Sequence, residues 1–431
     1  MKVPEWNPEV GWAATLPAEP PARRLRGTER ADCAIVGAGL TGLATARRLA
    51  ELRPDWRILL LDSSRCGSGS SGRSSGFIVD LPDFAAEMPP EHRDRYRRVA
   101  QTGLEDLRAL VRDHAIDCAW DDSGFLRGAA SEEGTRIVDS WPRRLDKIGV
   151  AYRQLDAAAM QEITGTAFYR SGLHMPGTAL AQPAALVRGL SKVLPENVLV
   201  CEESPVRVLD SGREIKLAAG EGTVVTPKLF LTTNGFTPAL GFLRSRIFPI
   251  LTFASLTRVL EPEEQRALGG RSEWGVLAMD PMGSTVRRTK DQRILIRNTV
   301  RCARTTAIGE RERRRIGEHH RAAFCARFPG LADVPFAFTW SGIMGTSRNR
   351  HCFFGRLKQD FFAAAGFNGA GIAMGTAAGR LLADLALGVD SDRLRDLLAL
   401  PTPTWMPPEP FLSLGGRFKV ASMNAQAGAY I

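Results

Sequence analysis

Near its N-terminus the chain reads Asp32-Cys33-Ala34-Ile35-Val36-Gly37-Ala38-Gly39-Leu40-Thr41-Gly42. The run 32–36 is short and apolar, as in a buried parallel strand. Residues 43–52 then follow a helical pattern, and 57–61 form a second apolar run that ends at Asp62. The sequence therefore predicts a strand–helix–strand unit with a glycine-rich turn between its first strand and its helix.

The glycine-rich turn has the spacing of a dinucleotide-binding site. Gly37 permits a tight turn, Gly39 lets the backbone approach a pyrophosphate, and Gly42 allows the helix to pack closely on the strand. The free N–H groups at the start of the helix attract phosphate. Asp62 is placed to accept hydrogen bonds from the adenosine ribose. The expected contacts are Gly37, Gly39, Leu40, Thr41, Gly42, Asp62 and Ser63.

A loop rich in glycine and serine, residues 66–76, follows this unit directly. Its many backbone N–H groups and hydroxyls could wrap a second phosphate or a ring system. Such a run can also be a flexible linker, but its place after the ribose-binding acid favours contact with the ligand. The expected contacts are Gly69, Ser70, Ser71, Gly72, Arg73 and Ser74.

The turn 37–43 together with the loop 67–73 resembles the D-amino-acid-oxidase superfamily of FAD-dependent amine oxidoreductases, and within it the γ-glutamylputrescine oxidoreductase group. Matching motifs recur at 231–235, 340–342, 354–357 and 366–372. The resemblance implies non-covalent FAD, with a helix N-terminus after 366–372 facing the flavin pyrimidine edge, where it would stabilise negative charge. It adds the cofactor contacts Val206, Asn234, Gly235, Gly366, Phe367, Asn368, Gly369, Gly371 and Ile372.

The chain departs from the family pattern close to the expected flavin ring and substrate. The departing positions are Ser70, Ser74 and Ser75 in the first loop, Asn368 and Ala370 in the last motif, and Cys352. None of them removes a phosphate contact. The resemblance therefore indicates the cofactor more firmly than the substrate.

The predicted fold is α/β plus α+β, with a Rossmann-like FAD-binding domain and a discontinuous substrate domain built on an antiparallel sheet. The FAD-binding domain is expected to combine 31–85, 155–238 and 338–390, and the substrate domain 86–154 and 239–337, between an irregular arm 1–30 and a C-terminal tail 391–431. The cofactor would perform the difficult chemistry while the protein orients the substrate.

By this resemblance, the chain is expected to oxidise the C–N bond of a small amine of the γ-glutamyl-polyamine or amino-acid type. A hydride would pass to flavin N5, the imine would be hydrolysed, and oxygen or another acceptor would take the electrons. Arg297, on an expected strand over the flavin, could bind a substrate carboxylate or lie at a solvated sheet edge. Arg287 could favour oxygen reduction, and Arg350 and His351 could bind substrate or move a proton.

Composition excludes several protein classes. The chain has 44% hydrophobic and 24% charged residues, which is typical of a globular protein. Seven scattered cysteines without a CxxC pair predict neither a metal site nor a disulfide framework, and they favour a reducing, cytoplasmic setting. The longest uncharged stretch, 361–379, contains five glycines, so we expect no membrane span.

Two other functions remain open, one of them because of the net charge of +10. The basic residues are mixed with acidic ones, so we expect no nucleic-acid partner, although a tRNA-modifying flavoprotein remains an alternative. The departures near the flavin also allow a non-catalytic, flavin-binding redox or interaction protein. The substrate, the electron acceptor and the oligomeric state do not follow from the sequence.

Overall fold

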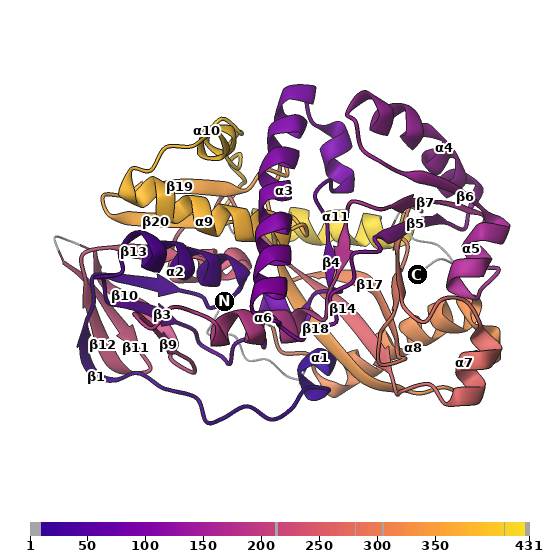
Figure 1. Ribbon diagram of the computed structural model, residues 1–431, viewed down its shortest axis with the longest axis horizontal. Coiled ribbons are helices and arrows are strands. Elements are labelled where there is room, and N and C mark those ends of the chain that lie inside the picture. The colour runs from indigo at the N-terminus through magenta and orange to yellow at the C-terminus, as the bar shows by residue number, and fades with distance from the viewer. Residues whose placement is uncertain (1–9, 212–213, 281, 304–305, 409, 427–431) are drawn as a thin grey trace.

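The computed structural model describes residues 10–211, 214–280, 282–303, 306–408 and 410–426. Two large sheets lie side by side, one covered by helices and the other mostly antiparallel, as Figure 1 shows. The predicted fold class, a Rossmann-like domain joined to an antiparallel-sheet domain, is confirmed.

The first sheet has six strands, and the strand–helix–strand unit lies at its centre. Their order is β19 (Phe353–Lys358), β20 (Phe361–Ala365), β13 (Leu229–Leu231), β2 (Cys33–Val36), β3 (Ile58–Leu61) and β9 (Val198–Cys201). The pairs from β20 to β9 are all parallel, and only β19 runs antiparallel to its neighbour. The central strands are fully buried, which explains their continuous apolar sequences.

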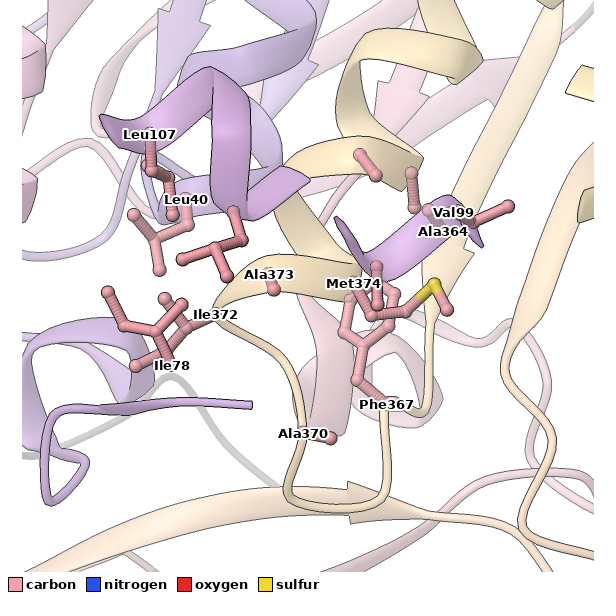
Figure 2. Packing of buried hydrophobic residues seen from close by; sticks show 14 of the residues in the cluster. Leu40, Ile78, Val99, Leu107, Ala364, Phe367, Ala370, Ile372, Ala373 and Met374 are labelled. Carbon is pink, nitrogen blue, oxygen red and sulfur yellow. The ribbon is translucent and has the colours of Figure 1, made fainter. Parts of the chain in front are cut away.

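Helices cover this sheet. They include α2 (Leu40–Leu52), α3 (Pro90–Asp113), α6 (Pro183–Lys192), α9 (Ala373–Leu387) and α10 (Asp392–Leu398). Helix α9 packs against both α2 and α3, and a Cβ at Gly103 would lie 2.0 Å from the Ala373 carbonyl oxygen, so glycine permits this close contact. Figure 2 shows Leu40, Leu107 and Phe367 in the apolar cluster around the start of α9. This packing fixes the starts of α2 and α9 relative to each other.

A four-stranded sheet flanks the first one. Its order is β1 (Arg26–Arg30), β12 (Glu221–Thr226), β11 (Ile215–Ala219) and β10 (Val206–Ser211). The arm 1–30 was expected to be irregular, but it contains β1, which pairs in parallel with β12, and the short helix α1 (Gly11–Ala14). Residues 10–30 are therefore part of the folded body, since buried side chains such as Trp12 pack against the second large sheet, which has eight strands.

The second sheet has eight strands. Their order is β18 (Phe336–Thr346), β14 (Phe248–Thr257), β17 (Ile294–Cys302), β16 (Thr285–Arg288), β15 (Trp274–Ala278), β5 (Phe125–Ala129), β7 (Ser171–Met175) and β6 (Arg153–Asp156). All pairs are antiparallel except β15 with β5. A small pair, β4 (Phe77–Ile78) with β8 (Ala179–Leu180), lies beside it.

The remaining helices lie mostly around the second sheet. They are α4 (Glu132–Lys147), α5 (Ala157–Thr164), α7 (Pro262–Leu268), α8 (Glu310–Arg327) and α11 (Phe411–Gln426), with 3₁₀ turns η1 (Ser70–Arg73), η2 (Asp83–Glu87), η3 (Asn234–Leu240) and η4 (Pro329–Leu331). None of the helices in the described ranges is both long and apolar enough to cross a membrane.

Several elements pair differently from the predicted domain pieces. Strands β7 and β18 were expected in the FAD-binding domain but pair within the eight-stranded sheet. Helix α3 was expected in the substrate domain but packs on α9. A helical or alternating pattern shows which face of an element is buried and not which sheet covers it, so these partners could not be predicted. The full domain boundaries stay a prediction.

Candidate active site

A cavity of about 790 Å³ lies where the glycine turn, the glycine–serine loop, the start of α9 and the eight-stranded sheet meet. Its lining comes from segments that are far apart in the sequence, from Val36 to Ile372. Most of the cofactor contacts predicted from the sequence lie on this one surface. The lining ones are Gly37, Gly39, Leu40, Thr41, Asp62, Ser63, Gly69, Ser70, Ser71, Gly72, Arg73, Ser74, Val206, Asn234, Phe367, Asn368, Gly369, Gly371 and Ile372.

Three predicted cofactor contacts lie behind the cavity wall. A Cβ at Gly42 would lie 1.8 Å from the Gly37 carbonyl oxygen, so Gly42 permits the turn to pack on the helix. Gly235 lies against Ile343 of β18. Gly366 has a φ of +83° and donates its N–H to the Asn234 side chain at 2.8 Å. These residues shape the backbone beneath the cavity without lining it.

The start of α2 forms one end of the cavity. Leu40 donates its N–H to the Ser71 hydroxyl at 3.2 Å, which joins the glycine turn to the glycine–serine loop. A Cβ at Gly39 would lie 2.7 Å from that hydroxyl oxygen and would close the gap between the two loops. This approach of bare backbone to a helix N-terminus suits a pyrophosphate.

Asp62 is held at the end of β3 next to this turn. Its carboxylate accepts hydrogen bonds from the N–H groups of Ala38, at 2.7 Å, and Ser64, at 2.8 Å. Burial raises the pKa of the Asp62 carboxyl from 3.8 to about 6, against the effect of these hydrogen bonds. A half-buried acceptor in this position fits the hydroxyl groups of a ribose.

The glycine–serine loop is fixed from below and open toward the cavity. The buried Arg73 guanidinium donates to the carbonyl oxygens of Ser68, at 2.7 Å, and Ser341, at 2.9 Å. Trp12 donates its Nε1–H to the Ser74 carbonyl oxygen at 2.8 Å. Among the described residues, the buried Ser70 hydroxyl has no hydrogen-bond partner. Since buried hydroxyls are normally paired, this group fits a ligand that completes the site.

The loop 366–372 closes the opposite side of the cavity. Asn368 has a φ of +54°, receives the Ser347 N–H at 2.9 Å and donates to the Gly366 carbonyl oxygen at 2.6 Å. These bonds present the residues before α9, including Gly371, to the cavity. The N–H groups at the start of α9 have no partner within the helix, so they favour a partial negative charge in front of them.

The four predicted catalytic residues divide into two pairs. Arg297 and Arg350 line the cavity. The Arg297 guanidinium donates to the Thr285 hydroxyl at 3.0 Å, which is its one hydrogen bond among the described residues. Burial lowers the pKa of Arg297, and the charge of Asp83 opposes that shift. The Arg350 guanidinium lies 5.8 Å from the centre of the Phe84 ring.

Arg287 and His351 do not line the cavity. Arg287 is 1% exposed and donates to the Ala181 carbonyl oxygen at 2.6 Å and to Glu273 at 3.0 Å, so its charge is already compensated beneath the glycine–serine loop. His351 packs edge-on against His92 with ring centres 5.9 Å apart, and burial and His92 lower the pKa of His351. These positions support neither the predicted role of Arg287 in oxygen reduction nor the predicted contact of His351 with substrate.

The lining residues without a predicted role include one pair of opposite charge. Arg127 on β5 forms an ion pair with Asp83 of η2, and both side chains line the cavity. The sequence offers one indication of a role for Arg127, which is that it stands in an otherwise apolar strand. Every residue of this strand, β5, is buried, and arginine is rarely buried without a partner. Its partner could not be inferred, because Asp83 reaches it from a different segment.

Residues 32–385 match the family model of FAD-dependent oxidoreductases, the DAO family. The chain belongs to this family. It is 27% identical to the probable oxidoreductase OrdL of Rhizobium meliloti, over 90% of each chain, and 25% identical to the γ-glutamylputrescine oxidoreductase of Escherichia coli, over 90% of this chain and 91% of the relative. The structure of glycine oxidase from Geobacillus kaustophilus shares the fold, with a TM-score of 0.71, 20% identity, and coverage of 84% of this chain and 96% of that one.

FAD is therefore the cofactor of this DAO-family chain, and the cavity fits it. The cavity lining includes the gap kept open at Gly39, the half-buried carboxylate of Asp62 and the unpaired hydroxyl of Ser70. The described residues offer no group of three or more His, Cys, Asp or Glu side chains that could share a metal ion.

Proposed function

We propose that the chain oxidises the C–N bond of a small amine that carries a carboxylate, of the amino-acid or γ-glutamyl-polyamine type. The observation that carries this proposal is Arg297, a cavity-lining cation whose protein contact is a neutral hydroxyl. A half-buried guanidinium without a direct ion pair favours an anionic ligand, and its planar donors match a carboxylate. Glycine oxidase and γ-glutamylputrescine oxidoreductase are named for compounds that combine an amine with a carboxylate, which supports this class.

The roles follow from the residues of the cavity. Bound FAD supplies the two-electron acceptor for the oxidation. Arg297 would bind the substrate carboxylate, and Thr285 would orient its guanidinium. The aromatic and aliphatic side chains of Phe77, Phe84 and Leu277 would exclude water from the substrate.

Anaerobic mixing tests this proposal. The purified holoprotein is mixed with γ-glutamylputrescine, free polyamines and amino acids while the visible flavin absorbance is followed. We expect bleaching by at least one amine that carries a carboxylate, and admission of air then shows whether oxygen accepts the electrons. Bleaching by dithionite but by none of these amines would contradict the proposal.

A further inference from the structure

A row of side chains crosses the face of the eight-stranded sheet that borders the cavity. Arg297 of β17 pairs with Thr285 of β16, and Arg127 of β5 pairs with Leu277 of β15. The register of β15 with β16, continued by one residue, places Leu277 next to Thr285. All four residues line the cavity. Since strands lie about 4.8 Å apart, the Cα atoms of the two arginines are roughly 14 Å apart.

Arg127 is fixed by contacts that do not depend on the cavity. Its side chain is 1% exposed, its Nη2 donates to the Leu81 carbonyl oxygen at 3.0 Å, and its guanidinium lies 4.4 Å from the centre of the Trp141 ring. Within the described ranges its Nε has no hydrogen-bond partner. The protein therefore holds this cation in place without satisfying all of its donors.

Asp83 is the exposed member of the ion pair. Its side chain is 61% exposed and belongs to the short turn η2, whereas Arg127 is buried in a strand. A buried cation needs an anion, and here the anion comes from a side chain that can turn toward solvent. Among the described residues that line the cavity, Asp83 is the only carboxylate besides Asp62, whereas the lining arginines include Arg127, Arg297 and Arg350.

We infer that Arg127 binds a second carboxylate of the substrate, and that this carboxylate takes the place of Asp83. The inference rests on the proposed function, in which Arg297 binds the first carboxylate. Arg127 and Arg297 then form a two-point clamp, with Leu277 and Thr285 between them. The clamp selects amines that carry two carboxylates and discriminates against those that carry one.

The test uses ligands that cannot be oxidised. The FAD-bound protein is titrated with a series of straight-chain dicarboxylates, from malonate to suberate, and with the monocarboxylates of equal carbon number, while the visible flavin spectrum is followed. At the best length we expect the dicarboxylate to bind at least about tenfold more tightly than its monocarboxylate. Arg127→Met should abolish this advantage and leave monocarboxylate binding unchanged. An equal affinity of the two series, or an advantage that persists in Arg127→Met, would overturn the inference.

Asp83→Asn gives an independent test, because an exposed side chain can be changed without emptying the core. It removes the carboxylate that competes at Arg127 and also acts on Arg297, so the affinity for dicarboxylates should rise several-fold more than the affinity for monocarboxylates. Unchanged or weaker dicarboxylate binding in Asp83→Asn would also overturn the inference, even if Arg127→Met does not fold. Arg108→Met, which removes a half-exposed ion pair with Asp122 outside the cavity lining, is the matched control. These titrations need no turnover, so failure to oxidise any amine would contradict the proposed function alone.

Discussion

At the scale of single residues, we expect the charge of Arg297 to contribute most to substrate binding. Arg297→Met keeps the length of the side chain but removes the donors. We expect KM for a carboxylate-bearing amine to rise about 10- to 100-fold, because a hydrogen bond to a charged group is lost. Steady-state kinetics would measure this change, with the exposed Arg266→Met as the control. A KM within twofold of the wild-type value would exclude this role.

His320 provides a prediction about pH at the same scale. It is fully buried beside β14, shares a 2.7 Å hydrogen bond with the Ser255 hydroxyl, and burial lowers the pKa of His320 to about 3. The unfolded chain binds this proton below pH 6.5 whereas the folded chain does not, so stability decreases as the pH falls. Between pH 7 and pH 5 the loss is about 2 kcal/mol.

Urea unfolding of the wild type and of His320→Asn at the two pH values checks this loss. The free energy of unfolding of the wild type should fall by about 2 kcal/mol more than that of the variant. An equal fall in both proteins would show that His320 does not contribute to the pH dependence.

At the scale of elements, the turn before α2 must stay free of side chains. A Cβ at Gly39 would meet the Ser71 hydroxyl at 2.7 Å, on the surface proposed for the pyrophosphate. Gly39→Ala should therefore fold with an unchanged far-ultraviolet spectrum but lose most of its bound FAD. Gly317→Ala, on α8 with open space around its Cβ position, should retain FAD. Full retention in both variants would contradict the proposed placement of the pyrophosphate.

The short helix α1 contributes a second prediction about an element. Trp12 donates to the Ser74 carbonyl oxygen, and its own carbonyl oxygen receives the Gln182 amide, both at 2.8 Å. Trp12→Phe removes the first bond and keeps most of the ring packing, so FAD should bind about fivefold less tightly. Fluorescence titration of the FAD-free protein measures this affinity, and the exposed Trp405→Phe serves as the control. Equal affinities would mean that α1 does not position the loop.

At the scale of the whole molecule, the sequence predicts the parts of the site that depend on local spacing. The turn around Gly39 and the acid Asp62 are examples, since strand, turn and helix follow one another within one unit. It does not predict the contacts that depend on register between distant strands. Arg287 and Arg297 both occupy predicted strands and share a face of the sheet, yet only Arg297 lines the cavity, because Arg287 lies one step further along and bonds to Ala181 and Glu273. Likewise, Arg127 meets Asp83 only after β5 and η2 are folded together.

The central claim is that this flavoprotein oxidises an amine held by its carboxylate, and one pair of compounds tests it most directly. The holoprotein is mixed anaerobically with an amino acid that reduces it and, separately, with the amine that this acid would give on decarboxylation. We predict rapid bleaching of the flavin by the amino acid and a rate at least about tenfold lower with the amine. Equal rates, or no reduction by any carboxylate-bearing amine, would contradict the account.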